Sequence, residues 1–189
     1  MKKTLISVLL VVVTAAAAFA GAFDKGGVLG IGGRALGMGH AFTAVADDGS
    51  CIYWNTAGLI QLDRSELDIF LGPLLNMKEI YTYISFGSSF FADTAWQLSV
   101  ISLIHNDKNM TKEFTVLGSF ASTLNLEKTF SVGVNVKYLN YNSTATYQIN
   151  PPTGPTLHGI ANGLGLDIGL LYQIPLPAWG KKFNLGLFI

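Results

Sequence analysis

Charged residues are scarce in this sequence of 189 residues. Only 13% are Asp, Glu, Lys or Arg, which is about half the share of an ordinary soluble domain. Twelve basic residues balance twelve acidic ones, so there is no positive excess to attract nucleic acid. Apolar residues make up 50% of the chain, and the mean hydropathy is +0.41. This composition excludes nucleic acid as a partner and indicates an outer surface that does not face water.

Residues suited to catalysis or metal binding are equally few. The chain has one cysteine, Cys51, so no internal disulfide can form. Its three histidines, His40, His105 and His158, give no pair with metal-ligand spacing. No Gly-x-Ser-x-Gly nucleophile motif occurs. We therefore expect no enzyme, no metal site and no cofactor.

The one long apolar run lies at the N-terminus. Two lysines follow Met1, apolar residues 5–13 come next, and small residues lead to Ala20. This pattern predicts a bacterial secretory signal peptide over residues 1–20, cleaved after Ala20. An uncleaved anchor is the alternative, but the strongly apolar part is shorter than the roughly 20 residues of a spanning helix. No cysteine follows the cleavage position, so a lipoprotein anchor is not expected.

After residue 23 the apolar pattern has a period of two, which is typical of strands. Residues 130–138 alternate apolar side chains with Ser, Gly, Asn and Lys, and residues 160–174 do so at greater length. Fifteen residues in a strand span roughly 50 Å, well beyond the usual globular strand. Weaker alternation marks residues 66–71, 79–91, 96–104 and 113–124, and another run begins at Phe183. We expect about seven strands over residues 65–189.

A secreted β-sandwich would show the same alternation, with its polar face in water. Here the less apolar faces carry Gly, Ser, Ala and Asn, where a solvated sheet would carry Lys, Glu and Thr. Aromatic residues also gather near predicted strand ends, as in the girdles of membrane barrels: Tyr81, Tyr83, Trp96, Tyr138, Tyr141, Tyr172 and Trp179. These features favour an all-β fold, a transmembrane antiparallel β-barrel.

Connection lengths are consistent with a barrel, because outer-membrane barrels alternate short periplasmic turns with longer external loops. The predicted connections are short at 92–94, longer at 105–112, short at 125–128 and long at 142–158. Single-chain bacterial barrels use an even number of strands from eight upward. We therefore expect this sequence to be the N-terminal part of a longer barrel; otherwise it must oligomerise or hide its edge.

The segment before the first strand begins with glycines. Residues 30–35 match a loose Gly-x-Gly-x-x-Ala dinucleotide motif, but residues 26–29 are no buried strand and no Gly-Lys-Ser/Thr follows. A nucleotide site is therefore not expected. Asp47 and Asp48 could be paired catalytic carboxylates, but we expect them to cap a helical turn over residues 51–54.

The same segment has residues suited to tight packing. Asn55 can bond its own backbone, and Gly58 permits a positive φ before the chain enters the first strand. Gly37 and Gly39 allow close approach to another surface. These properties predict a compact plug segment over residues 21–64, shaped to sit inside the barrel.

Three motifs carry a resemblance: GRALGMG at 33–39, AVADD at 44–48 and YWNTAGL at 53–59. Together they resemble the N-terminal signature of the FadL-like outer-membrane proteins, nearest to the PorV/PorQ family. The resemblance implies that this segment is a plug inside a large barrel. Two residues depart from the signature, since His40 replaces a small residue and Thr56 replaces a proline whose fixed φ would hold the turn.

The resemblance implies two functions of different kinds. One is passive uptake or binding of hydrophobic small molecules such as fatty acids. The alternative is a PorV-like adaptor, which receives secreted protein clients and passes them to a surface-attachment system. Both place the exported protein among the lipids of the bacterial outer membrane, and both give the same plug-shaping residues: Gly37, Gly39, Asp47, Asp48, Asn55, Ala57 and Gly58.

Overall fold

The computed structural model describes residues 30–74, 79–91, 93–105, 112–124, 127, 129–146, 156–176 and 181–189. The predicted signal peptide and Trp179 lie outside these residues. Within the described part of the chain, no helix is long and apolar enough to cross a membrane.

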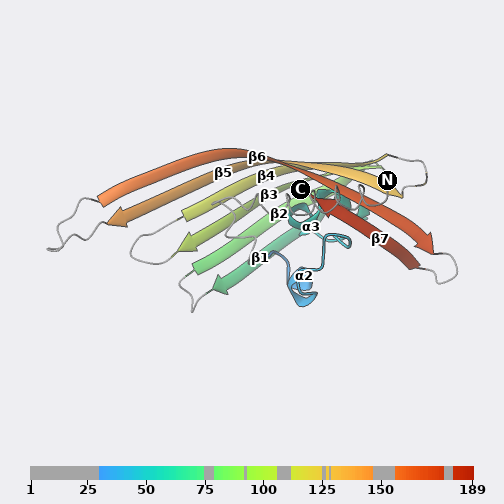
Figure 1. The fold of residues 1–189 in the computed structure, drawn as a ribbon, viewed down its shortest axis with the longest axis horizontal. Coiled ribbons are helices and arrows are strands. Elements are labelled where there is room, and N and C mark those ends of the chain that lie inside the picture. Colours follow the sequence, from blue (N-terminus) through green and yellow to red (C-terminus); the bar gives the residue numbers. More distant parts are fainter. Residues whose placement is uncertain are drawn as a thin grey trace, which may run out of the picture.

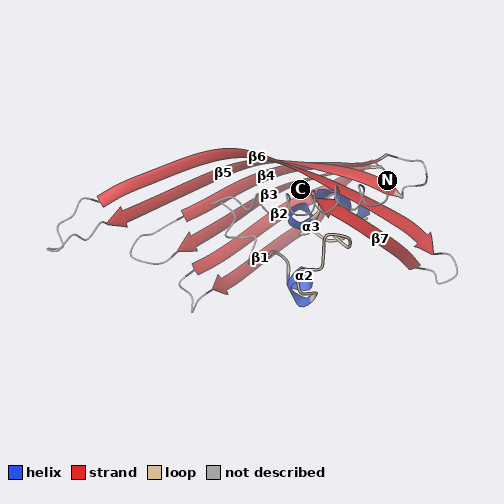
Figure 2. Cartoon of the chain, in the orientation of Figure 1, coloured by secondary structure: helices blue, strands red, loops and turns tan. Residues whose placement is uncertain are grey.

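Seven antiparallel strands form one sheet in chain order, and the sheet curls into a half-barrel (Figure 1, Figure 2). The strands are β1 (Glu66–Leu74), β2 (Glu79–Phe91), β3 (Thr94–His105), β4 (Lys112–Thr123), β5 (Phe130–Thr146), β6 (Thr156–Leu176) and β7 (Lys181–Phe188). The predicted number and order of strands are confirmed. The expectation of a loop over residues 142–158 is wrong in part, because β5 runs to Thr146 and β6 starts at Thr156.

The two ends of the sheet are named here by their connections. The loop end carries the β1–β2, β3–β4 and β5–β6 connections, and the turn end carries the other three. Within the described residues, β1 and β7 each pair with one strand only, so the sheet is open. The predicted barrel is thus observed as a half-barrel with two free edges.

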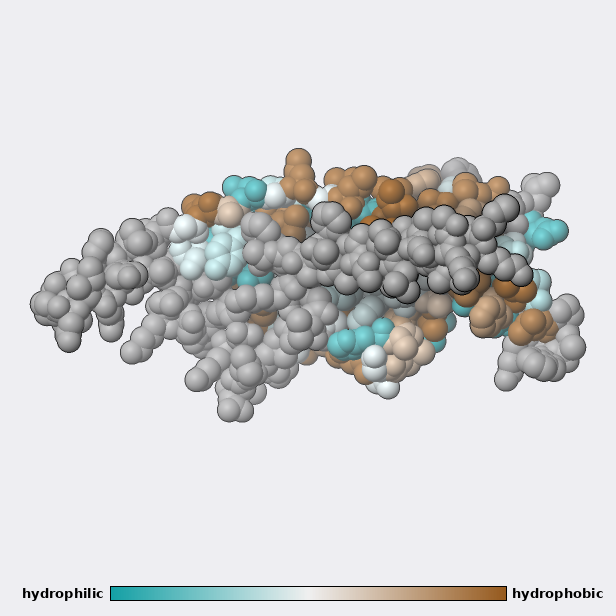
Figure 3. Space-filling view, in the orientation of Figure 1, coloured by the Kyte–Doolittle hydropathy of each residue, from teal (hydrophilic) through white to brown (hydrophobic). Residues whose placement is uncertain are grey.

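The convex face of the sheet is apolar. Paired positions form rows across the strands, one of which joins Ile69, Ile84, Val100, Val116, Tyr138 and Leu164. These side chains point away from the rest of the chain; Leu164, for example, is 83% exposed. Figure 3 shows apolar side chains gathered along this side.

The concave face carries polar residues and glycines together with buried apolar side chains such as Tyr83, Leu117 and Leu171. Its buried polar residues are Ser85, Gln97, Ser99, Glu113, Ser119, Ser131, Asn135, Asp167 and Gln173. The sheet thus buries most of its polar side chains and exposes a continuous apolar face, whereas a soluble sheet turns its polar face to water. The alternation predicted from sequence is confirmed, and the tertiary structure decides which face is covered.

Residues 30–62, called here the inner segment, lie against the concave face (Figure 1). They contain α2 (Gly33–Gly37), α3 (Cys51–Trp54) and the 3-10 helix η3 (Thr56–Gln61). Two buried apolar clusters join this segment to the sheet. One includes Phe42, Leu59, Ala95 and Ala121, and the other, nearer the loop end, includes Ile31, Ile52, Tyr81, Tyr83, Leu103 and Leu117.

Some of the aromatic residues predicted to form a girdle lie on the convex face, and others do not. Tyr138 and Tyr172 are exposed on the convex face, and Trp96 lies in the same convex row as Phe120. Tyr81 and Tyr83 are buried on the concave face, at 2% and 0% exposure. Periodicity near a strand end could not separate the two faces, because aromatic residues suit a girdle and a packed core equally well.

Candidate functional site: the contact between the inner segment and the sheet

Asn55 fixes the turn between α3 and η3. Its Oδ1 accepts a hydrogen bond from the N–H of Ala57 at 3.1 Å, as predicted for an Asn that bonds its own backbone. Its Nδ2 donates to the carbonyl of Thr43 at 2.8 Å and to that of Leu170, on β6, at 3.0 Å. One buried amide therefore joins two parts of the inner segment to the sheet.

Asn135, on β5, is the centre of a buried polar network. Its Oδ1 accepts from the Thr56 hydroxyl at 2.5 Å and from the Ser119 hydroxyl at 2.6 Å. Its Nδ2 donates to the Ile52 carbonyl at 2.9 Å and to Asp167 Oδ2 at 3.1 Å. All hydrogen-bonding capacity of this amide is used.

Asp167 extends the network to a charged group. Its Oδ1 lies 2.6 Å from Lys137 Nζ, and both side chains belong to the concave face. The pair is more than two-thirds buried, with the lysine side chain 29% and the aspartate 11% exposed. The two opposite charges on the concave face neutralise each other. Asp167 also accepts a hydrogen bond from the Asn135 amide, which binds the inner segment.

Glycines on the sheet let the inner segment approach the backbone. A Cβ at Gly133 would overlap the backbone of Thr56 and Ala57, and one at Gly169 would overlap the Asn55 side chain. The sequence analysis assigned no role to these two strand glycines. In the structure, η3 and the residue before it pack directly against them. Ala57 is fully buried there.

Gly58 was expected to supply a positive φ, and that expectation is wrong. It is not among the residues with positive φ. A Cβ at this position would instead collide with the carbonyl of Ala46. The glycine is needed because η3 packs directly on the preceding turn of the segment.

The carbonyl of Gly49 is a second point of attachment. It accepts from the Tyr83 hydroxyl at 2.7 Å, the Ser85 hydroxyl at 3.1 Å and Gln97 Nε2 at 2.6 Å. These three donors come from neighbouring strands β2 and β3. The concave face therefore satisfies a loop carbonyl that would otherwise be buried without a partner.

The predicted capping role of the acidic pair is wrong in detail. Ser50 is the N-cap of α3, with no side-chain cap bond. Asp48 instead orders the turn before it, since its Oδ1 accepts from the Ser50 N–H and hydroxyl at 2.9 and 2.6 Å. Asp47 pairs with Arg34 through two contacts of 2.5 and 3.2 Å, and this hydrogen bond raises the pKa of the guanidinium.

Gly37 and Gly39 lie on the exposed side of the inner segment. No heavy atom lies within 4 Å of a Cβ built at either position, so the described residues make no close approach there. Gly39 has a φ of +63°, which favours glycine for its own backbone. His40 beside it has a φ of 67°, and its ring packs on Trp54 at 5.4 Å.

Cys51 is fully buried in the inner segment. Burial raises the pKa of the thiol well above its usual value, and Sγ lies 3.8 Å from Gln97 Oε1. A buried neutral thiol is a packing group and has no nucleophilic role.

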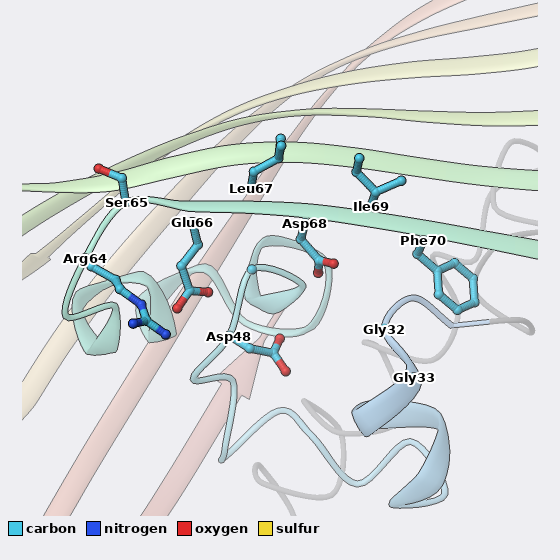
Figure 4. A pocket seen from close by; sticks show the side chains of 11 residues that line it. Gly32, Gly33, Asp48, Arg64, Ser65, Glu66, Leu67, Asp68, Ile69 and Phe70 are labelled. Atoms are coloured by element: carbon cyan, nitrogen blue, oxygen red, sulfur yellow. The ribbon is translucent and has the colours of Figure 1, made fainter.

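A depression of about 520 Å³ lies between the inner segment and β1 (Figure 4). Asp48, Glu66, Asp68 and Arg64 line it together with Phe70. Among the described residues, no group of three His, Cys, Asp or Glu side chains could hold a metal ion. The depression follows the free edge of β1 and is distinct from the buried network around Asn135.

The sequence-predicted residues thus divide into three groups. Asn55, Ala57 and Gly58 lie at the contact with the sheet, Asp48 orders the turn beside the Gly49 attachment, and Gly37, Gly39 and Asp47 lie away from the sheet. The residues that sequence reasoning missed are the sheet partners: Ser119, Gly133, Asn135, Lys137, Asp167 and Gly169. One sequence feature could have identified these residues: a polar residue that lies among glycines on the less apolar face of a strand. Asn135 and Asp167, which are paired across β5 and β6, both show this feature.

No known protein family matches this chain, and neither does any curated protein or solved structure.

Replacing Asn135 with Ala should lower the free energy of unfolding of the full chain by about 1–3 kcal/mol, because it leaves the Thr56, Ser119 and Asp167 groups short of a buried partner. Urea titration in detergent micelles, followed by tryptophan fluorescence, measures this change. The matched control is Asn142→Ala on the exposed face, which should stay within about 0.5 kcal/mol of the parent. Equal effects of the two substitutions would contradict the assigned role of Asn135.

Thr56→Val should cost about 0.5–1.5 kcal/mol in the same measurement, because it keeps the side-chain shape and removes one hydrogen bond. Thr56→Ser retains the hydroxyl and should lose less. If Val is tolerated as well as Ser, the hydroxyl of Thr56 does not hold the inner segment.

Proposed function

We propose that this protein is an outer-membrane β-barrel protein whose convex face contacts lipid. The observation that carries this proposal is the reversed polarity of the sheet, with apolar side chains exposed and polar ones buried. A contiguous apolar surface of this extent is costly in water and suits the hydrocarbon core of a bilayer.

The distribution of charge supports the same proposal. On the described convex face, charged residues occupy two positions, both at strand ends: Lys112 at the loop end of β4 and Lys181 at the turn end of β7. Charged residues within the strands, such as Asp68, Glu113, Lys137 and Asp167, occupy concave positions. Strands with an uncharged outer face and a polar inner face are typical of membrane barrels.

A barrel in lipid leaves no strand edge unpaired. The proposal therefore requires further strands between β7 and β1, supplied by this polypeptide or by another copy. In the closed barrel, the inner segment would lie in the lumen as a plug, with its attachment to β4, β5 and β6 already in place.

For the ligand, we favour a hydrophobic small molecule such as a fatty acid. The inner wall toward the loop end is lined by Phe70, Ile101 and Leu103 together with Tyr81 and Leu117. Ile31 and Ile52 of the inner segment cover part of this wall, and the partly buried Phe70 and Ile101 at its border offer apolar contact to a ligand that enters from the loop end. Apolar lining with few polar groups is usual in sites for hydrophobic ligands.

A PorV-like adaptor for secreted proteins is the second candidate. It is favoured by the length of β5 and β6, which have 17 and 21 residues and extend past β4 at the loop end. Strands that project from a barrel offer a surface to a protein client.

The lipid-facing role is tested by Val136→Lys, which places a charge in the middle of the convex face. The cost at a bilayer midplane is about 2–4 kcal/mol, so this variant should be depleted from the outer-membrane fraction of cells that express the full chain. Leu139→Lys, on the concave face of the same strand, is the matched control and should still insert. Normal insertion of the Val136→Lys variant would exclude a lipid-facing convex surface.

The ligand is tested with a fluorescent long-chain fatty acid and the full chain in lipid nanodiscs. Saturable binding is expected, and Ile101→Asn should weaken it about tenfold, equivalent to about 1.4 kcal/mol. Ala161→Asn adds the same amide to the concave face at the loop end and should change binding little. If the parent shows no saturable binding and captures secreted proteins instead, the adaptor is the correct function.

A further inference from the structure

The convex face of the β5–β6 pair is continuously apolar up to one row and predominantly polar beyond it, where Ile160 is the apolar exception among the described convex positions. Toward the turn end, the paired convex residues are Val134 with Ile168, Val136 with Leu166, and Tyr138 with Leu164. The next pair toward the loop end is Asn140 with Asn162. Their side chains are hydrogen-bonded to each other on the exposed surface, Asn140 Nδ2 to Asn162 Oδ1 at 2.7 Å.

Tyr138 lies at the border between the apolar and the polar rows and contacts both. Its direct partner across the strands is Leu164, but its hydroxyl donates to Asn162 Oδ1, one row further toward the loop end, at 2.9 Å. The ring thus covers the apolar side and the hydroxyl reaches the polar side. Tyrosine takes this orientation where an apolar phase meets water.

The apolar stretch below this row matches a bilayer in height. It runs from Phe130 to Tyr138 on β5 and from Leu164 to Ile174 on β6. A tilted strand needs roughly 9–11 residues to cross the hydrocarbon core. At its turn end, the stretch finishes with the aromatic pair Phe130 and Tyr172, whose rings are 6.2 Å apart.

Beyond the polar row, β5 and β6 leave the rest of the sheet. The last pairing of β4 with β5 joins Lys112 to Asn142, whereas β5 continues to pair with β6 as far as Thr146 with Thr156. Figure 1 shows these two strands extending past their neighbours. The backbone pairs formed by residues 143–146 and 156–159, called here the projecting ribbon, have no third strand beside them in the described structure.

We propose that the outer boundary of the lipid bilayer crosses β5 and β6 at the cluster of Tyr138, Asn140 and Asn162. The occupant of the apolar convex face below it is lipid acyl chain, and the projecting ribbon stands in water outside the cell. This inference rests on the proposed membrane function and adds the depth and orientation of the chain. Two hydrogen-bonded amides would be costly in hydrocarbon, so the boundary lies below them.

The test uses single cysteines on the convex face in a Cys51→Ser background of the full chain. Val136→Cys lies below the boundary, and Asn142→Cys and Ile160→Cys lie above it on a directly paired row. Intact cells are treated with a membrane-impermeant maleimide. Modification of the two upper variants should be at least tenfold faster than that of Val136→Cys. The same three sites are also measured with an environment-sensitive maleimide dye and lipid-attached quenchers.

Each other result has a definite meaning. Rapid modification of Val136→Cys in folded protein would refute the lipid-facing surface and with it the proposed function. If Val136→Cys is protected and the upper sites react only after the periplasm is opened, the membrane function stands and the orientation is wrong. If all three dyes are quenched by lipid, the membrane function stands and the assigned boundary is wrong, because lipid then reaches at least the row of Asn142 and Ile160.

Ile160→Lys provides a control that does not depend on labelling. Above the boundary, a lysine should leave outer-membrane insertion within about twofold of the parent, because the cost of a charge falls close to zero at the interface. Loss of insertion as severe as that of Val136→Lys would overturn the assigned boundary.

Discussion

The buried polar face of the sheet is the constraint on which the rest of the structure depends. A concave surface with Gln97, Asn135 and Asp167 is stable only when each polar group finds a partner. The inner segment supplies partners for Gln97 and Asn135 through main-chain carbonyls at Gly49 and Ile52 and through the hydroxyl of Thr56, and Asp167 pairs within the sheet with Asn135 and Lys137. Because these polar side chains point inward, the apolar alternate positions of the same strands must point outward. The exposed apolar convex face follows directly from the polar contact within.

Thr56 stands where the signature that this segment resembles has proline, and the structure gives it a contact of its own. It is the first residue of η3 and follows Asn55, whose backbone is extended at φ −170° and ψ 104°. This is the geometry in which proline is favoured at the start of a helix and tolerated by the residue before it. The chain instead uses a hydroxyl that reaches Asn135 on the sheet. His40, the other departure, adopts a left-handed φ that glycine would take without strain.

Much of the fold could be predicted from alternation alone, because a period of two defines a strand whatever its surroundings. The range 79–91 was obtained correctly, and β5 and β6 were underestimated where Thr, Ser and Asn replace apolar residues. The residues of the candidate site were harder to predict from the sequence. Asn55 was found because an Asx turn is a local property, whereas Asn135 and Gly133 lie almost 80 positions further along and carry no local sign of their partner. The prediction that Asp47 and Asp48 cap a helix was wrong, because helix caps and Asx turns favour the same residue types.

The sequence by itself determined the export-type start, the depletion of charge, the antiparallel strands and the compact segment ahead of them, since these depend on composition and near-neighbour periodicity. Only the tertiary structure decided which face of each strand is covered, why Gly58 and Gly133 must be glycine, and that Asn135 connects β5 to four other elements, β4, β6, α3 and η3. The physical reason is that burial and hydrogen-bond satisfaction are properties of pairs distant in sequence. A strand pattern can state that its two faces differ, but only the partner packed against one of them makes it the inside.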